Sequence, residues 1–311
     1  MDHNLARIKY TLATLVVLLL ALAPASALAE DVSGVVNTTR AKVTGIGADF
    51  IIVNDVTGFA TGDTVVVVQM KGDAIIISND GNFGIHDNHV GDGGYYEFIV
   101  VQAVESGTKK ITFYNNLKGA YDVTAFVQVV KVESYETLRV TGEITCPAWD
   151  GAAGTGGVIA IFASDKIILE DNISATAKGF RGGTGSMVLG DCLGDTPPST
   201  AYYNEASTLG GRKGEGFASH SEFLTPLVLS TYAKGPGAIG TGGGGGWGGL
   251  SGAGGGGSHN NGGQGGEEAI CGVPNPGGVG GRKIDNFFTD AGAIVMGGGG
   301  GSAGYKSGSA P

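Results

Sequence analysis

Charged side chains are scarce in this chain, and basic ones are scarcer than acidic ones. Asp, Glu, Lys and Arg make up only 15% of the 311 residues, and 19 Lys and Arg stand against 29 Asp and Glu, for a net charge of −10. The basic residues are scattered and form no stripe. A nucleic-acid-binding surface requires a basic patch, so the composition excludes nucleic acid as a partner.

Cysteine is also rare, with three residues, Cys146, Cys192 and Cys271. None lies in a Cys-x-x-Cys or Cys/His spacing, so the sequence does not indicate a zinc site. Export favours disulfides, and an odd count leaves at least one thiol unpaired. Because Cys192 and Cys271 lie in Gly/Pro-rich loops while Cys146 ends a strand-like run, we predict a disulfide between Cys192 and Cys271 and a free, buried Cys146.

The chain has no hydrophobic run long enough to cross a bilayer comfortably. Its apolar run at 12–23 holds about a dozen residues, against the ~20 that a membrane-spanning helix needs. Basic residues precede the run and small residues up to Ala29 follow it, as in a secretory signal peptide. We therefore predict that residues 1–29 are cleaved off between Ala29 and Glu30. The mature protein is then secreted or at the cell surface, without stable membrane insertion; an uncleaved anchor is the alternative.

A helical apolar period is absent throughout. Residues 30–146 instead contain short runs rich in Val, Ile, Phe and Tyr that are bounded by Gly, Asn or Asp, which is typical of strands and turns. The runs lie at 49–53, 64–70, 74–78, 95–104, 110–114, 125–132 and 138–145. Strands at this spacing predict an N-terminal all-β domain over 30–146, either a small β-barrel or a β-sandwich.

Glycine is what the chain has in abundance, with 60 residues, most of them in the second half. There, short apolar runs at 156–163, 166–170 and 172–177 are separated by a few polar residues, as in the rungs of a β-solenoid. We predict that residues 147–311 form a glycine-rich β-solenoid-like domain, which makes the chain all-β. Only a glycine turn and a polar tail follow the strand-like run at 293–296, so we expect a C-terminally incomplete domain prone to self-association.

The densest glycine segment, residues 235–281, is about half glycine, and ordering it carries a large entropic cost. Two outcomes are open. The segment is disordered, or its backbones pack closely as extended or polyproline-II-like chains whose amides bond to one another. Large apolar side chains such as Trp247 and Ile270, with Phe287 shortly after the segment, punctuate this part of the chain, and we therefore expect order.

A set of short motifs runs along nearly the whole mature chain. They are Gln69-Met70-Lys71-Gly72 after the segment 57–68, Gly94-Tyr95-Tyr96-Glu97-Phe98, Val127-Gln128-Val129-Val130-Lys131-Val132, Pro147-Ala148-Trp149, Gly179-Phe180-Arg181-Gly182-Gly183, Gly214-Glu215-Gly216 and the glycine runs at 242–246, 277–281 and 297–304. As a set they resemble motifs of large secreted, glycine-rich surface proteins of gliding Bacteroidetes-type bacteria. The resemblance implies an exported protein with an N-terminal β domain and a glycine-rich, solenoid-like region; it implies no particular activity.

No catalytic constellation is visible in the sequence. Residues 300–304 match the G-x-S-x-G pattern, but the strand before it and the helix after it that a nucleophile elbow requires are missing. His220, His259 and Glu215 lie in separate glycine-rich loops without an acid–base pattern. We therefore predict that the protein is not an enzyme and needs no cofactor.

An oxygen-rich loop is a candidate for a calcium site. Asp80, Asn82, Asp87 and Asp92 offer carboxylate and amide oxygens at close spacing, which calcium prefers. The alternative is a long loop that uses Asx turns, in which the side-chain oxygen bonds the backbone two residues on. We favour the Asx turns, because the spacing and the terminal Glu of an EF-hand are missing.

Two functions from different classes fit these features. The first is an exported structural or adhesive protein of the cell surface or extracellular matrix, with extracellular glycans or other surface proteins as partners. The alternative is a polysaccharide-binding or polysaccharide-degrading β-solenoid protein, with Trp149, Trp247, Tyr202 and Tyr203 as sugar-stacking candidates. We interpret these aromatic residues as core plugs, because the region has few other large side chains to bury, and we favour the first function.

Overall fold

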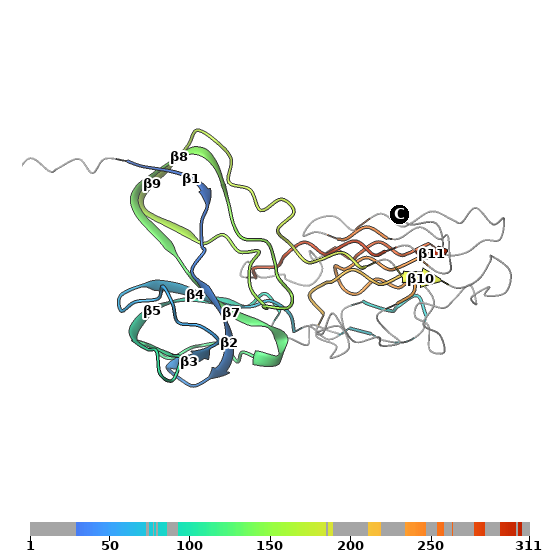
Figure 1. Ribbon diagram of the computed structural model, residues 1–311, viewed down its shortest axis with the longest axis horizontal. Coiled ribbons are helices and arrows are strands. Elements are labelled where there is room, and N and C mark those ends of the chain that lie inside the picture. The colour runs from blue at the N-terminus through green and yellow to red at the C-terminus, as the bar shows by residue number, and fades with distance from the viewer. Residues whose placement is uncertain are drawn as a thin grey trace, which may run out of the picture.

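The structure, a computed structural model, places a barrel, a small parallel sheet and a bundle of glycine-rich segments beside one another (Figure 1). The residues that it describes are 29–72, 75–76, 78, 80–85, 93–184, 186–188, 211–218, 234–246, 254–257, 263, 277–283, 293–302 and 304–306. Among these residues, no helix has the length and apolarity needed to cross a membrane.

The first part of the chain folds into a closed barrel of six antiparallel strands. In the order in which neighbours are hydrogen-bonded, the strands are β2 (Arg40–Ile46), β3 (Phe50–Val53), β6 (Lys110–Phe113), β5 (Tyr96–Glu105), β4 (Thr64–Gln69) and β7 (Val127–Lys131). A short 3-10 helix, η1 (Val123–Ala125), precedes β7. Of the two folds predicted for the N-terminal strands, a barrel forms and not a sandwich, and it spans β2 to β7, whereas β1 and β8 from the same predicted domain pair in a separate sheet.

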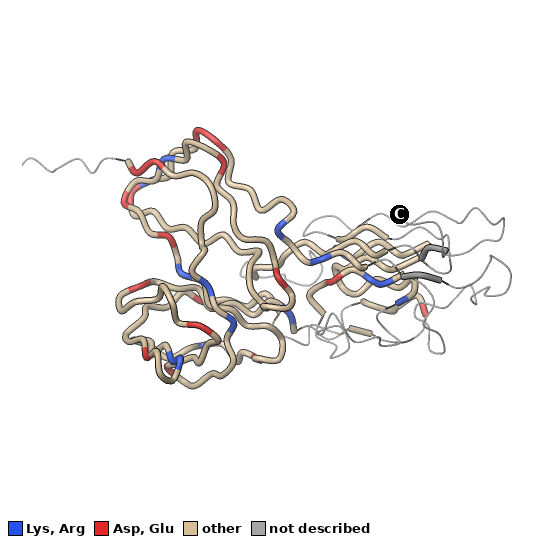
Figure 2. The backbone as a smooth tube through the Cα atoms, viewed as in Figure 1, with Lys and Arg blue, Asp and Glu red and all other residues tan. Residues whose placement is uncertain are grey.

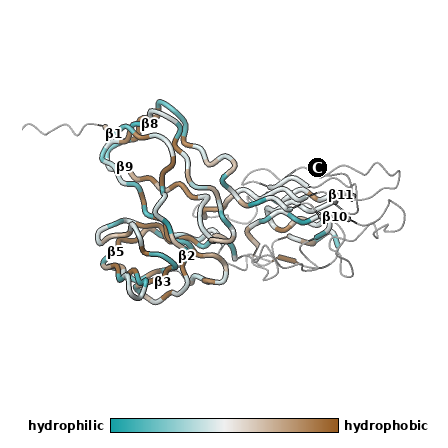
Figure 3. The backbone as a smooth tube through the Cα atoms, in the orientation of Figure 1, coloured by the Kyte–Doolittle hydropathy of each residue, from teal (hydrophilic) through white to brown (hydrophobic). Residues whose placement is uncertain are grey.

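Strand β4 shows why the barrel forms from these residues. Its four consecutive valines are all buried, which is possible because both faces of the strand are covered. Val65 and Val67 belong to the core inside the barrel, whereas Val66 and Val68 pack outside it against residues of the second half of the chain such as Met296. Figure 3 shows hydrophobic residues concentrated along the barrel strands.

A small parallel sheet lies next to the barrel (Figure 1). Its strands, in spatial order, are β1 (Glu30–Val35), β8 (Glu133–Thr145) and β9 (Ile161–Leu169). The end of the run expected at 156–163 and most of the run at 166–170 therefore form one strand, β9, with an irregularity between Ala163 and Lys166 where the register against β8 shifts. A parallel bridge between Ile144 and Ile173 extends the pairing along β8 beyond the end of β9. This single small sheet does not establish the predicted solenoid.

The described glycine-rich segments form a bundle in which hydrogen bonds run in more than two directions. Segment 297–302 exchanges backbone hydrogen bonds with four others, 180–183, 212–215, 243–246 and 254–257. A β-strand in a sheet or a solenoid has at most two such neighbours. Bonds that point outward in several directions are instead typical of extended chains with three residues per turn, as in polyproline II.

Glycine is required in this bundle because backbones meet at contact distance. A Cβ atom on Gly244 would overlap the carbonyl oxygen of Pro236, and one on Gly299 would overlap that of Arg181. Of the two outcomes open for the glycine-rich region, the described segments thus show close backbone packing. At one edge of the bundle, the short strands β10 (Ser186–Val188) and β11 (Gly304–Lys306) pair in parallel.

Candidate functional site

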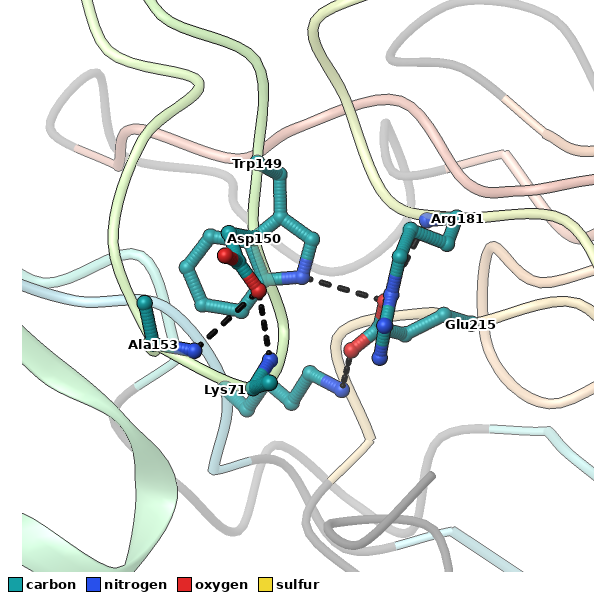
Figure 4. Close-up of polar contacts among 7 residues, drawn as sticks. Lys71, Trp149, Asp150, Ala153, Arg181 and Glu215 are labelled. Carbon is teal, nitrogen blue, oxygen red and sulfur yellow. Dashed lines mark hydrogen bonds and ion pairs between the residues drawn. The ribbon is translucent and has the colours of Figure 1, made fainter. Parts of the chain in front are cut away.

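Four charged or aromatic residues from distant motifs meet where the barrel contacts the glycine-rich bundle (Figure 4). Glu215 accepts hydrogen bonds from the Lys71 ammonium at 2.6 Å, the Trp149 indole N–H at 3.0 Å and the Arg181 Nε at 3.2 Å. Its Oε2 also accepts the backbone N–H of Arg181. Each of the four residues belongs to a different one of the short motifs noted in the sequence. We call them the charge cluster.

Aromatic rings enclose the charge cluster. Phe126, Trp149 and Phe180 stack edge to face in a row, with centroids 5.9 and 5.6 Å apart. The Lys71 ammonium lies 5.4 Å from the centre of the Phe126 ring and 5.1 Å from that of Phe180. Lys71 itself is fully buried. Such rings attract a cation through their electron-rich faces, so the lysine has both a counter-ion and an apolar enclosure.

Burial and pairing set the charge state of this cluster. Burial alone would raise the pKa of Glu215, but Lys71, with Trp149 and Arg181, outweighs it and holds the pKa below its ordinary value. Burial lowers the pKa of Lys71, and the Glu215 carboxylate opposes that shift. Three side chains from both parts of the molecule hold the Glu215 carboxylate, so the cluster joins the barrel to the bundle.

A surface cleft of about 560 Å³ lies between the barrel and the small sheet. The residues on the barrel side of the cleft are Gly62, Asp63, Thr64 and Lys131. The residues on the sheet side are Val132, Glu133, Ser134 and Tyr135 in and just before β8, and Phe162 and Ser164 in β9. Its volume is within the range of small-molecule sites in proteins. Figure 2 shows acidic and basic residues distributed over the barrel and sheet, whereas the charged residues of the described glycine segments are mainly basic.

The cleft combines an exposed aromatic ring with hydroxyl and charged groups. Phe162 is 57% exposed, which is high for so large an apolar side chain. Lys131 and Asp63 form an ion pair at 2.8 Å, and Asp63 also accepts the Ala60 N–H. Burial, with the charges of two nearby glutamates, raises the pKa of the Tyr135 phenol, which therefore stays a neutral hydrogen-bond donor.

The predicted site residues have mixed outcomes. Cys146 is free and buried, as predicted, whereas Cys192 and Cys271 lie outside the described residues. Residues 1–28 lie outside the described residues, and Glu30 begins β1. The signal peptide and its cleavage after Ala29 therefore stay predictions.

The calcium candidates are only partly described. The Asp80 carboxylate accepts the Ser78 hydroxyl at 2.9 Å and the Asn82 N–H at 2.8 Å, which is the Asx-turn alternative. Asp87 and Asp92 lie outside the described residues. Across the described part of the chain, no three His, Cys, Asp or Glu residues gather as metal ligands would.

Of the aromatic and histidine candidates, only Trp149 lies within the described residues. Trp149 is buried and its N–H is taken up by Glu215, which matches its interpretation as a core plug. Trp247, Tyr202, Tyr203, His220 and His259 lie outside the described residues. Sequence reasoning missed the cleft residues Tyr135 and Phe162.

Comparison with known proteins gives no family. No protein-family model and no curated protein matches the chain. Solved structures with partial similarity include the tailspike protein gp49 from Pseudomonas phage LKA1, at 18% identity over 37% of this chain and 21% of that one, with a TM-score of 0.20. The tailspike gp61 of Pseudomonas phage phi297 shares 17% identity over 35% and 17% of the two chains, with a TM-score of 0.22.

A third similar structure is the Gp54 tailspike of Acinetobacter baumannii bacteriophage AP22, solved in complex with a capsular saccharide of A. baumannii. It shares 10% identity over 50% of this chain and 24% of the tailspike, with a TM-score of 0.21. The chain spans about a fifth of the length of these tailspikes. At these TM-scores the similarity does not define a common fold.

The state of the three cysteines can be measured directly. We expect no thiol of the folded protein to react quickly with a thiol reagent, because Cys146 is buried and burial raises the pKa of its thiol. In denaturant without reductant, one thiol per chain should react, and after reduction all three cysteines should react. Three reactive thiols without reductant would show that Cys192 and Cys271 are not paired.

Proposed function

We propose that this protein is an exported, non-catalytic adhesive protein that binds an extracellular glycan in the cleft between its barrel and its small sheet. The observation that carries the proposal is the exposed Phe162 ring in a cleft whose other lining residues mostly carry hydroxyl or charged groups. A sugar presents the matching surface, since it has an apolar C–H face that an aromatic ring covers and hydroxyls that polar groups bond.

The polar groups of the cleft suit binding. Thr64, Ser134 and Ser164 bring hydroxyl groups that both donate and accept hydrogen bonds, and the Tyr135 phenol adds another. About a third of the Lys131 side chain is exposed in its ion pair with Asp63. The lysine ammonium can therefore donate a hydrogen bond to a ligand hydroxyl while the ion pair stays intact. These groups come from two rigid elements, so they need no folding step before a ligand binds.

The carboxylates of the cleft support binding without cleavage. A glycosidase requires two carboxyl groups free to act on the glycosidic bond, one as an acid and the other as a base or nucleophile. Here Asp63 is held by Lys131 and Ala60, and the Glu133 carboxylate accepts the Asn37 N–H at 3.2 Å. Asp63 is therefore engaged within the barrel, and Glu133 is bonded to the segment that links β1 to β2.

The test is a screen of the purified protein on an array of bacterial and plant polysaccharides, followed by titration of the best ligand. Phe162→Ala should weaken that binding about tenfold, since losing one buried aromatic contact costs roughly 1.5 kcal/mol. Phe98→Ala is the matched control, because Phe98 is 56% exposed but lies on β5 outside the cleft. It should leave affinity unchanged.

Two outcomes would contradict the proposal. Binding that is equally weakened by Phe162→Ala and Phe98→Ala would place the glycan elsewhere, and no binding to any polysaccharide would remove the function. A polysaccharide that is bound and then shortened, measured as new reducing ends, would show that the protein is an enzyme and that the non-catalytic part is wrong.

A further inference from the structure

Four basic residues gather around one turn of the structure, at residues 150–155. Arg40 and Lys42 lie on β2, and Lys178 and Arg181 lie at the start of the glycine-rich bundle. All four are half-buried, so part of each residue faces solvent. We call these four residues the basic patch. The chain has a net charge of −10, so a gathering of positive charge at one place gives that surface a potential opposite to that of the whole.

The turn brings the two sides of the basic patch together. A Cβ atom on Gly151 would overlap the Arg181 guanidinium, and one on Gly154 would lie 3.2 Å from Cδ of Lys42. The two glycines belong to one turn, which a backbone bridge closes. Lys42 and Arg181 are far apart in the sequence, but they therefore border the same short loop, and glycine at both positions leaves room for their side chains.

Two titratable groups show that the positive charges converge here. Hydrogen bonds from two N–H groups of the turn lower the pKa of the exposed Asp150 carboxyl, and the charges of Arg181 and Arg40 lower it further. Burial raises the pKa of the Cys146 thiol, shortly before the turn, and the charges of Lys178 and Arg40 oppose that rise. The Asp150 carboxylate is therefore an anion beside the patch, and it competes with any anionic ligand.

Most of the patch is not neutralised by the protein itself. Arg181 is ion-paired within the charge cluster. Arg40, Lys42 and Lys178 form no ion pair with any residue that the structure describes. The Nε of Arg40 is buried without a hydrogen-bond partner, and the Lys42 ammonium lies 4.9 Å from the centre of the Phe126 ring. Cations that are held in place but lack a counter-ion can bind the carboxylate or sulfate of a ligand.

We propose that the basic patch binds the anionic groups of an acidic polysaccharide, either uronate carboxylates or sulfate esters. Duplex DNA carries one charge per about 1.7 Å of its axis, so it would press many phosphates against an acidic protein for the sake of four cations. A polysaccharide whose charges are sparse requires only the cations present here. The inference goes beyond the proposed function, because the patch shares no residue with the cleft.

The experiment is a titration of the full protein with carboxymethyl dextran and with unmodified dextran, which share a backbone but differ in carboxylates. The wild type should bind the first and not the second. Raising the ionic strength to about 0.15 M should weaken the binding about fivefold, because exposed charges are then screened beyond about 8 Å. Lys42→Gln and Lys178→Gln should each weaken it about threefold, and the double variant about tenfold.

Asp150→Asn should have the opposite effect and strengthen the binding about threefold. Asparagine removes the competing charge but keeps a side-chain oxygen that accepts the N–H groups of the turn. A purely structural role of the turn would not produce a gain in affinity. Lys118→Gln, which removes the charge of an exposed lysine outside the patch, is the matched control and should leave the affinity unchanged.

Several results would overturn the proposal, provided that circular dichroism shows the variants to be folded. They are no binding of carboxymethyl dextran by the wild type, a loss in Lys118→Gln equal to that in the patch variants, and weaker binding in Asp150→Asn. Tighter binding of duplex DNA than of carboxymethyl dextran would show that the partner is a nucleic acid. Phe162→Ala should leave this binding unchanged, so a failure of the cleft and a failure of the patch are distinguishable.

Discussion

Replacing Glu215 by glutamine should lower the free energy of unfolding by about 3 to 5 kcal/mol, the cost of breaking a buried ion pair by removing one partner. Glutamine has one carbonyl oxygen where glutamate has two. Either the Lys71 ammonium or the donors of Trp149 and Arg181 would then face an NH₂ group. The Lys71 charge would stay in an apolar enclosure without a counter-ion. Guanidinium unfolding measures the loss.

Lys71→Met should cost clearly less than Glu215→Gln. Methionine fills the space between the Phe126 and Phe180 rings, and Glu215 keeps its bonds to Trp149 and Arg181. The double variant should be more stable than the sum of the two single losses predicts, because no unpaired charge is left buried. An exposed control, Glu105→Gln, should change stability by less than about 0.5 kcal/mol. Equal losses in Glu215→Gln and Lys71→Met would contradict this account of the cluster.

The same cluster should make the wild type sensitive to acid. Because the pKa of folded Glu215 lies below its ordinary value of 4.5, the stability from its ionised form is present above that pH. It is lost as the pH falls through the folded-state pKa. The Glu215→Gln variant lacks the titrating group, so the difference in stability between wild type and variant should shrink below pH 4.5. A difference that stays constant to low pH would show that Glu215 does not titrate with folding.

The barrel could be predicted from the sequence because the information for it is local. Val-rich runs bounded by turn residues, such as 64–70, specify strands without reference to the rest of the chain. The run at 74–78 is only partly within the described residues, and the run at 138–145 is part of β8, which pairs in the small sheet. The sequence alone does not say which strands leave a barrel, since that depends on long-range pairing.

The charge cluster could not be predicted from the sequence, because its members are far apart. Lys71 and Glu215 are 144 residues apart, and each alone resembles a solvated loop residue. One signal was present. Lys71, Arg181 and Glu215 are single charged residues inside otherwise glycine-rich or apolar motifs, and charges of both signs in such surroundings are expected to pair when buried. Phe162 was missed because it lies in a run assigned to a strand, and only the register against β8 places it in the cleft.

The arrangement of the glycine segments could not be predicted either. In a sheet, the alternation of side chains reveals which face is buried, but glycine has no side chain to record where its amides point. Residues 243–246 and 297–302 bond to each other and to several further segments, although nothing in either run distinguishes it from the other glycine runs. Order in this region depends on close contacts between backbones. Substituting single glycines by alanine, which adds one methyl group, should therefore test whether those contacts exist.

Gly299→Ala should therefore destabilise the protein strongly and Gly300→Ala should not, although the two residues are adjacent. A Cβ on Gly299 would overlap the Arg181 carbonyl, whereas the nearest atom to a Cβ on Gly300 is 3.6 Å away. Both glycines are hydrogen-bonded to neighbouring segments, Gly299 to Glu215 and Gly243, and Gly300 to Gly183. Both positions therefore begin with backbone hydrogen bonds. A difference in stability between the two variants would come from the space available for one methyl group.

The first variant should lose at least about 3 kcal/mol of unfolding free energy, since backbone cannot move aside without breaking the bonds of the surrounding segments. The second should be neutral or gain up to about 1 kcal/mol, because alanine has fewer unfolded conformations to lose. Gly297→Ala, with its nearest atom at 3.9 Å, should behave like the second. Guanidinium unfolding measures the stability of each variant. Hydrogen exchange of the Gly243 amide, which bonds the Gly299 carbonyl, measures local protection in the bundle. Similar behaviour of all three variants would mean that segment 297–302 is not enclosed by backbone, and the bundle would have to be abandoned.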